Sequence, residues 1–287
     1  MPKYLLGNVP IDRVRIMGVI NVSPESFYKN SVKVSSKEIT ETASEIEKQG
    51  VDFIDIGGMS TAPYVNTLVS QEKEIERIKL AIKAVRDESS LPISVDTPRA
   101  ATAETALNLG ATIVNDVTGL KFDSKMARII HDNDASMILC AYEKNIVSGN
   151  VVNATIRALR KSIQIAKNAN IRSNRIVIDP AIGFFRENGK HPFFTKMKGT
   201  NWVNRDLTLI SKLKQLQSLR KPICVSVSRK SFLGKILNLE NPSDRLIAST
   251  SAEAISVLNG ANIIRTHNVH ETVHAVRIAE TLLKNSS

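Results

Sequence analysis

The residues D-F-I-D-I at positions 52–56 form a short apolar run, and an amphipathic stretch at positions 71–86 follows them. The same order is repeated at once: I-S-V at 93–95 precedes an amphipathic stretch at 99–109, and T-I-V-N at 112–115 begins the next repeat. Short β-branched runs predict strands, and apolar residues spaced at about 3.6 predict helices. Because the runs are largely apolar on both faces, they predict parallel strands covered by helices.

This alternation continues in both directions along the chain. We predict eight strands, at residues 15–20, 52–56, 93–95, 112–115, 136–140, 175–178, 223–226 and 262–264. The further helices are predicted at 36–49, 151–168, 206–219, 244–258 and 269–283. Eight consecutive units favour a closed (β/α)8 TIM barrel. A doubly wound open sheet is the alternative, but no Gly-x-Gly-x-x-Gly follows the first strand.

Length and charge limit the class of protein. The 287 residues suit one barrel, and no linker or change of composition divides them, so we predict a single domain over residues 1–287. The net charge of +11 raises nucleic acid as a partner. However, Lys and Arg alternate with Asp and Glu, without zinc-finger spacing or a basic tail. We therefore expect anionic small molecules, and no nucleic acid, as ligands.

The cysteines and the N-terminus bear on location. Cys140 and Cys224 each lie inside an apolar run, which predicts buried thiols in a reducing compartment. Residues 1–10 lack the apolar stretch of a signal peptide, and no run approaches the roughly 18 apolar residues of a membrane span. We therefore expect a cytoplasmic protein without membrane contact.

Polar residues recur where the predicted strands end. They are Asn21, Asp55, Asp96, Asn115, Asp116, Asp179, Arg229, Lys230, Arg265 and His267. Any one of them has a simpler explanation as the N-cap of the next helix. All strand ends of a parallel barrel face one mouth, where TIM-barrel enzymes have their active sites, so together they predict a site.

The predicted site has two chemical halves. Asp96, Asp179 and Asn115 suit a flat heterocycle with several N–H donors, such as a 2-amino-4-oxopteridine. Lys230 would meet the carbonyl of that ring, and Phe184 would stack on it.

The cations form the other half. Lys230, Arg265 and His267, with Arg229 as a further candidate, suit an anionic group, because barrels often bind phosphate after strands seven and eight. His267 is equally explained as an ordinary loop histidine. Residues 179–203 are long for a connection, and structureless segments of that size are usually functional or mobile.

Seven segments, in order, resemble the motifs of dihydropteroate synthases. They are M-G-V-I-N-V-S-P-E-S-F at 17–27, I-D-I-G-G-M-S-T at 54–61, S-V-D-T at 94–97, N-D-V-T-G at 115–119, D-P-A-I-G-F at 179–184, S-R-K-S-F-L-G at 228–234 and R-T-H-N-V at 265–269. The resemblance implies a reaction of folate biosynthesis. In it, 6-hydroxymethyl-7,8-dihydropterin diphosphate condenses with 4-aminobenzoate to give dihydropteroate and diphosphate, in a homodimer that uses Mg²⁺.

The resemblance also implies roles for single residues. Asp96, Asn115, Asp179 and Lys230 would hold the pterin beside Phe184, with Asp96, Asp179 and Lys230 as the catalytic residues. Asn21 would ligate Mg²⁺, Arg265 and His267 would bind the diphosphate, and Thr61 and Ser231 would lie on the aminobenzoate side. In this family the diphosphate leaves first and the amine then attacks.

Three loops and one further residue, in the loop after the sixth strand, depart from the family pattern. Ala62, Pro63 and Tyr64 stand where the second loop usually has Arg-Pro-Gly, and Tyr28, Lys29 and Asn30 replace the usual Asp-Gly-Gly of the first loop. Cys140, Ala141 and Tyr142 replace a Met- and His-containing segment after the fifth strand, and Ala181 replaces a glycine. Lys29 is a candidate substitute for the lost loop cation.

These departures leave alternatives open. The same chemistry on a modified arylamine, such as a ribosylated aminobenzene, would explain the changed second and fifth loops. A pterin-dependent methyltransferase would share the aspartate–asparagine cradle, although the S-R-K-S and R-T-H segments favour a diphosphate leaving group. A catalytically inactive pterin-binding relative would explain the missing loop arginine.

Overall fold

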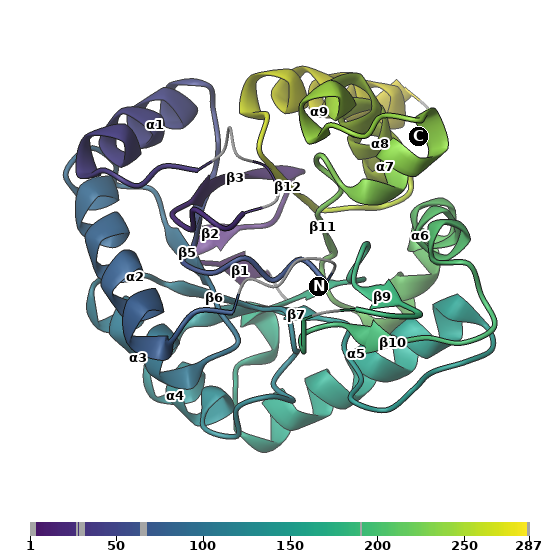
Figure 1. The fold of residues 1–287 in the computed structure, drawn as a ribbon, viewed down its shortest axis with the longest axis horizontal. Helices are drawn as coiled ribbons and strands as arrows, with labels where there is room; N and C mark the ends of the chain where they lie inside the picture. Colours follow the sequence, from purple (N-terminus) through teal and green to yellow (C-terminus); the bar gives the residue numbers. More distant parts are fainter. Residues whose placement is uncertain (1–3, 27, 29–31, 64–67, 190, 286–287) are drawn as a thin grey trace.

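The structure, a computed structural model, describes residues 4–26, 28, 32–63, 68–189 and 191–285. Eight parallel strands form its central sheet, and helices surround that sheet (Figure 1). The strands are β3 (Arg15–Asn21), β4 (Phe53–Gly57), β5 (Ile93–Asp96), β6 (Ile113–Asp116), β7 (Ser136–Cys140), β8 (Ile176–Asp179), β11 (Cys224–Val225) and β12 (Ile263–Thr266). All eight predicted strands are present, within two residues of the predicted bounds at either end.

The sheet closes on itself. Neighbouring strands pair in the order β11-β12-β3-β4-β5-β6-β7-β8. The two ends meet where Ile178 in β8 forms a parallel bridge with Ile223, and the Ile178 N–H donates to the Pro222 carbonyl oxygen at 2.9 Å. The predicted (β/α)8 barrel is confirmed, and the open doubly wound alternative is wrong.

Two layers of side chains fill the barrel, because alternate residues of a strand face the same side. The lower layer is apolar and buried, and it consists of Met17, Phe53, Ile113, Ile138, Val177, Cys224 and Ile263. Two residues further along, the same strands carry Asp55, Asn115, Asp179 and Arg265. The apolar layer thus supports a polar layer at the C-terminal ends of the strands.

A short hairpin closes the opposite end of the barrel. β1 (Leu5–Leu6) and β2 (Val9–Pro10) pair in antiparallel orientation. Leu6 is fully buried in the lower apolar layer, and the Gly7 N–H donates to Ser136 Oγ at 3.1 Å. This hairpin was not predicted, because two-residue strands show no periodicity.

The helices are α1 (Ser36–Lys48), α2 (Gln71–Arg86), α3 (Ala100–Asn108), α4 (Met126–Asp132), α5 (Val151–Asn168), α6 (Trp202–Ser211), α7 (Ser231–Leu237), α8 (Leu246–Leu258) and α9 (Val269–Asn285). The 3₁₀ helices are η2 (Ser173–Arg175), η3 (Leu213–Leu219) and η4 (Pro242–Arg245). Among the residues that the structure describes, none of the helices has the length and hydropathy that a bilayer crossing requires.

Two predicted helices had the wrong bounds. The one at 206–219 is α6 followed by η3. α6 begins four residues earlier than predicted, because the Asn201 side chain caps it by accepting from the backbone N–H groups of Val203 and Asn204. The one at 244–258 begins as η4 and continues as α8.

The long segment after β8 is ordered by pairing. Its strands β9 (Phe185–Arg186) and β10 (Thr195–Lys196) are parallel. The loop after β7 adds to this pair: the Glu143 N–H donates to Thr195 Oγ1 at 2.8 Å, and the Val147 N–H donates to the Lys196 carbonyl oxygen at 2.9 Å. In the described part, the segment is therefore not a structureless loop.

Candidate active site

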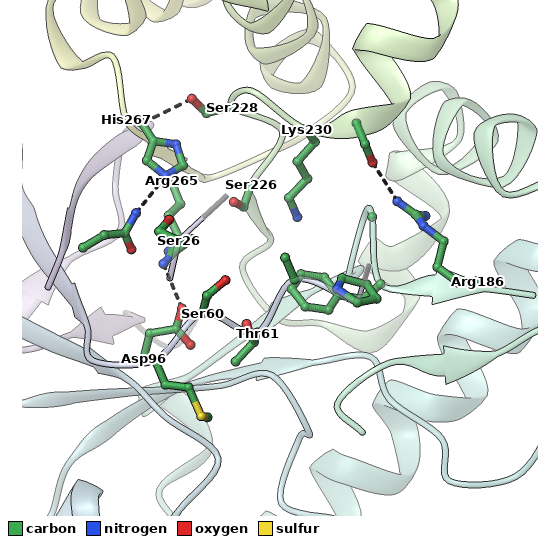
Figure 2. A pocket seen from close by; sticks show the side chains of 17 residues that line it. Ser26, Ser60, Thr61, Asp96, Arg186, Ser226, Ser228, Lys230, Arg265 and His267 are labelled. Atoms are coloured by element: carbon green, nitrogen blue, oxygen red, sulfur yellow. Dashed lines mark hydrogen bonds and ion pairs between the residues drawn. The ribbon is translucent and has the colours of Figure 1, made fainter. Parts of the chain in front are cut away.

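A pocket of about 670 Å³, open to solvent, lies at the C-terminal ends of the barrel strands (Figure 2). Eight of the ten predicted site residues line it: Asn21, Thr61, Asp96, Phe184, Lys230, Ser231, Arg265 and His267. Asn115 and Asp179 do not line it and are buried. The structure therefore brings most of the predicted residues together.

Asn115 and Asp96 are neighbours across β5 and β6, where they occupy the same register. The Oδ1 atom of Asn115 is buried and has no hydrogen-bond partner among the described residues. A buried amide oxygen without a partner is rare and costs about 1–3 kcal/mol. The Asn115 Oδ1 atom can therefore accept a hydrogen bond from a ligand.

Asp179 and Lys230, both predicted to bind a pterin, are oppositely charged groups that influence each other electrostatically. Burial raises the pKa of Asp179, and the charge of Lys230 is the largest opposing influence. Burial likewise lowers the pKa of Lys230 to about 8, while Asp179 opposes this shift. One Asp179 oxygen accepts from the Ala181 N–H at 2.6 Å, so the carboxylate has a fixed orientation.

Lys230 crosses the loop after β8 at Gly183. Its Nζ donates to the Ile182 carbonyl oxygen and lies 4.8 Å from the centre of the Phe184 ring. Gly183 has a φ of +89°, and a Cβ atom there would be 3.0 Å from Lys230 Cδ. A glycine at this position thus lets the lysine pass.

Arg265 is held between two aspartates. Its Nε donates to Asp55 Oδ2 at 2.7 Å, and a terminal nitrogen donates to Asp96 Oδ2 at 2.9 Å. Burial raises the pKa of Asp96, and Arg265 is the strongest opposing influence. The sequence placed Asp55 at a strand end without assigning it a role; the structure shows that it positions Arg265.

His267 and Asn21 form a second wall. His267 Nε2 lies 3.5 Å from Asn21 Nδ2, and the His267 N–H donates to Ser228 Oγ at 3.2 Å. Burial, together with the charge of Arg265, lowers the pKa of His267 to about 3, so the ring is neutral near pH 7. Tyr28 meets the ring edge-on at 5.6 Å between centroids.

Arg229 has a different environment from the other predicted cations. It is buried and is not among the residues lining the pocket. Its guanidinium donates to Asn268 Oδ1 at 2.8 Å and to the Ser243 carbonyl oxygen at 2.5 Å. These contacts tie the loop after β11 to the neighbouring loops, and they make Arg229 a structural residue rather than an anion ligand.

The structure describes only part of the loops that differ from the family pattern. Ala62 and Pro63 line the pocket, whereas Phe27, Lys29, Asn30 and Tyr64 lie outside the described residues. The suggested replacement of the loop cation by Lys29 therefore stays untested. Ala181 adopts a φ of +55°, a left-handed conformation that favours glycine, which is the residue the family pattern has there.

The sequence did not single out Arg186, which also lines the pocket. This residue lies in the short strand β9, within a segment whose fold no local pattern predicts. Its position depends on pairing with β10 and on contacts with α6 and α7.

A family of known proteins matches this arrangement. Residues 17–267 match the family model described as pterin binding enzyme. The chain belongs to this pterin-binding enzyme family. The family that the sequence motifs suggested is confirmed.

Individual relatives agree with the family match. Dihydropteroate synthase of Clostridium beijerinckii is 31% identical over 278 residues, which cover 95% of this chain and 96% of that protein. Dihydropteroate synthase from Coxiella burnetii, solved with pteroic acid, superposes with a TM-score of 0.82 at 30% identity and covers 98% of both chains. The enzyme from Xanthomonas albilineans in complex with 7,8-dihydropteroate gives a TM-score of 0.81 at 25% identity and 99% coverage of both chains.

The function follows from these relatives. The predicted dihydropteroate synthase function, a transfer of a pterinylmethyl group, is confirmed at the level of the family members that match the whole chain. They favour this function over the pterin-dependent methyltransferase.

Proposed function

We propose that the pocket joins 6-hydroxymethyl-7,8-dihydropterin diphosphate to 4-aminobenzoate, with the pterin above Asn115. The observation that carries this assignment is the buried, unpartnered Oδ1 atom of Asn115 beside Asp96. A pterin ring presents adjacent N–H donors and a carbonyl acceptor, which complement an amide and two carboxylates. Asp179 and Lys230 complete the cradle, and Phe184 covers it.

The diphosphate would occupy the wall formed by Asn21, Arg265 and His267. Arg265 contacts Asp96 as well as lining the pocket, so a diphosphate and a pterin would each take one side of this ion pair. The neutral His267 would donate an N–H, and Arg265 would supply the positive charge.

Magnesium fits this wall as a substrate-borne ion. Among the described residues, no group of three or more His, Cys, Asp or Glu side chains surrounds a metal position. Asn21, whose side chain carries one amide oxygen, lines the pocket wall. Mg²⁺ commonly keeps several waters and binds largely through substrate phosphates, so few protein oxygens suffice. When bound through Asn21, it would neutralise charge on the leaving diphosphate.

The remaining chemistry is electrostatic. The bond between the pterin methylene carbon and the diphosphate oxygen breaks, and its electron pair leaves with the diphosphate. The arylamine nitrogen then bonds to that carbon and loses a proton. Asp96 and Asp179 stabilise the positive charge that develops on the pterin, while Arg265 and Lys230 stabilise the leaving anion. Thr61 and Ser231 would flank the arylamine.

A homodimer completes the proposal. Apolar side chains are exposed along one groove, and they are Leu207 on α6, Ile236 and Leu237 on α7, and Ile247 and Ile255 on α8. Ile247 is 79% exposed, which is unusual for an isoleucine in a monomer surface. A second copy of the chain would bury this groove.

The cytoplasmic location stays a prediction. Both cysteines are buried and free, as a reducing compartment allows.

Competition between two arylamines tests the proposed substrate. Given pterin diphosphate, Mg²⁺, 4-aminobenzoate and a ribosylated aminobenzene, the protein should form dihydropteroate, identified by mass spectrometry. A product that carries the ribosylated amine would instead support the modified arylamine that the altered loops suggested. Tight binding of pterin diphosphate without any product would support the inactive relative.

A further inference from the structure

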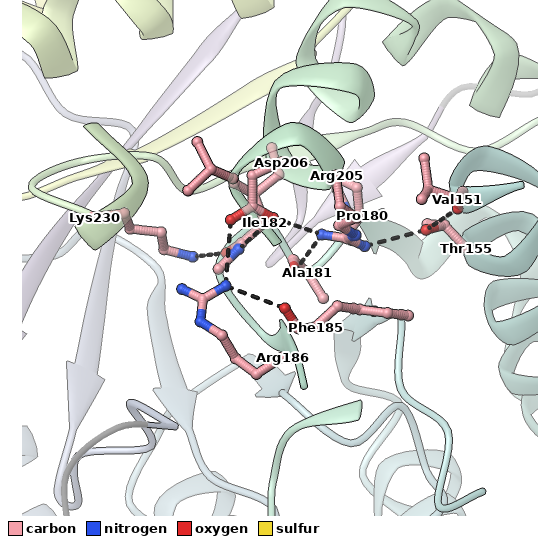
Figure 3. A network of polar contacts seen from close by, with 12 residues as sticks. Val151, Thr155, Pro180, Ala181, Ile182, Phe185, Arg186, Arg205, Asp206 and Lys230 are labelled. Carbon is pink, nitrogen blue, oxygen red and sulfur yellow. Dashed lines mark hydrogen bonds and ion pairs between the residues drawn. The ribbon is translucent and has the colours of Figure 1, made fainter. Parts of the chain in front are cut away.

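Arg186 presents a fixed guanidinium group at the pocket (Figure 3). One terminal nitrogen donates to Ser231 Oγ at 3.0 Å, and the other donates to the Phe185 carbonyl oxygen at 3.1 Å. The group also lies over the Trp202 ring, 3.9 Å from its centre. With a relative exposure of 6%, the side chain is held in place before any ligand binds.

The carboxylate nearest to Arg186 is shared with a second arginine. Asp206 lies 3.0 Å from Arg205 and 3.5 Å from Arg186, so its closer partner is Arg205. Asp206 also accepts from the Gly183 N–H at 3.0 Å. The Asp206 carboxylate is therefore shared between the two arginines and the Gly183 N–H, and its contact with Arg186 is the longest of the three.

The two arginines differ in what they face. Arg205 is fully buried and donates to the carbonyl oxygens of Pro180 and Ala181, so it belongs to the scaffold under the loop. Arg186 is the member of this pair that lines the pocket. It therefore brings positive charge to the surface that a ligand meets.

Arg186 and Arg265 lie on opposite sides of the pocket in Figure 2, with Lys230 between them. Arg265 belongs to the wall proposed for the diphosphate, and it is paired there with Asp55 and Asp96. Arg186 contacts Ser231 on the opposite side. A pair of substrates with one anionic group at each end would match this separation of cations.

We propose that Arg186 and Ser231 bind the carboxylate of the arylamine and so select an anionic arylamine over a neutral one. This role rests on the proposed function. Ser231 Oγ accepts from Arg186 and still has its own O–H to donate. A carboxylate would take one hydrogen bond from the guanidinium and one from the hydroxyl, both charge-assisted.

Paired substrates test this role. We would measure kcat/KM with 4-aminobenzoate and with its neutral amide, 4-aminobenzamide, for the wild type, Arg186→Gln and Arg186→Lys. Arg128→Gln, an exposed change on α4, is the matched control. Loss of one charge-assisted contact should lower kcat/KM for 4-aminobenzoate about 10- to 100-fold in Arg186→Gln. The amide should change by less than about 3-fold, and Arg186→Lys should recover part of the loss, because the removed contact is to the carboxylate alone.

The outcomes separate this role from a structural one. An equal loss with both substrates, or no loss with either, would overturn the proposal. Calorimetry with dihydropteroate and its carboxamide provides a readout without turnover. If the wild type does not turn over, yet Arg186→Gln weakens binding of dihydropteroate alone, the proposed function fails while Arg186 keeps its role. Equal weakening of both ligands would refute that role as well.

Discussion

Arg265 and Asp96 form a 2.9 Å ion pair between the proposed diphosphate side and the proposed pterin side of one pocket. Asp55, fully buried, holds the same guanidinium from below at 2.6 Å. One arginine thereby sets the position of both halves of the site. Its partners are 169 and 210 residues away in the chain, so the pairing of the last barrel strand β12 with the first, β3, is what brings the three together.

Removing Arg265 should destabilise the fold as well as the site. Arg265→Ala leaves Asp55 buried without its cation, and breaking a buried pair costs about 3–5 kcal/mol. Urea unfolding should show this loss, and the double variant Asp55→Asn/Arg265→Ala should recover part of it, because the fully buried Asp55 charge is then removed and only Asp96 lacks its cation. An unchanged unfolding midpoint in Arg265→Ala would contradict the paired geometry.

The pterin cradle should depend on Asp179 and Lys230. Asp179→Asn and Lys230→Ala should each weaken binding of pterin diphosphate at least about 10-fold, since each removes a charge-assisted contact. Titration calorimetry measures this directly, and Lys235→Ala, an exposed change on helix α7, which begins directly after Lys230, is the control. Unchanged affinity in both cradle variants would mean that the pterin binds elsewhere.

Affinity for pterin diphosphate should fall as the pH rises through about 8. Burial lowers the pKa of Lys230 to about 8, so above that pH the folded protein loses the cation that the ligand needs. Lys230→Arg should remain charged and lose this dependence. Binding constants between pH 6.5 and 9.5 test it, and an equal decline in wild type and Lys230→Arg would assign the effect to another group.

The same pKa shift has the opposite sign for stability. An unfolded lysine titrates at about 10.4, so between about pH 8 and 10 the unfolded chain binds more protons at this position than the folded protein does. The contribution of Lys230 to the free energy of unfolding should therefore rise with pH in that window. Unfolding free energies of wild type and Lys230→Met should converge as the pH increases; parallel curves would count against the shift.

The exposed groove of α6, α7 and α8 should carry the dimer. Ile247→Asp places a charge in it and should give folded monomers, whereas Ile278→Asp, on the exposed face of α9 outside the groove, should remain dimeric. Sedimentation velocity distinguishes the two. A monomeric wild type, or dissociation caused only by Ile278→Asp, would refute the assignment.

The sequence predicted the site well where strand periodicity determined it. Asp96, Asn115 and Asp179 face the barrel interior because alternate strand residues do, and the β/α repeat itself predicts that their strands are parallel. Periodicity also explains what was missed. α4 and α7 have only seven residues each, and the strands of the β1–β2 hairpin have two, so neither gives a readable pattern.

Contacts between distant residues could not be predicted. Arg186 occupies a two-residue strand, and its direction is set by Trp202 and Ser231 rather than by its neighbours. The different roles of Arg229 and Lys230 likewise depend on residues of other loops: Asn268 contacts Arg229, and Gly183 lies beside the Lys230 side chain. Adjacent cations in the sequence thus acquire different functions from tertiary contacts.

Release of diphosphate from 6-hydroxymethyl-7,8-dihydropterin diphosphate, measured with Mg²⁺ in the presence and absence of 4-aminobenzoate, tests the central claim most directly. We predict release that yields one dihydropteroate per diphosphate in the wild type and that is lost in Asp179→Asn. Binding of the pterin diphosphate without aminobenzoate-dependent release, or undiminished release in Asp179→Asn, would contradict the account.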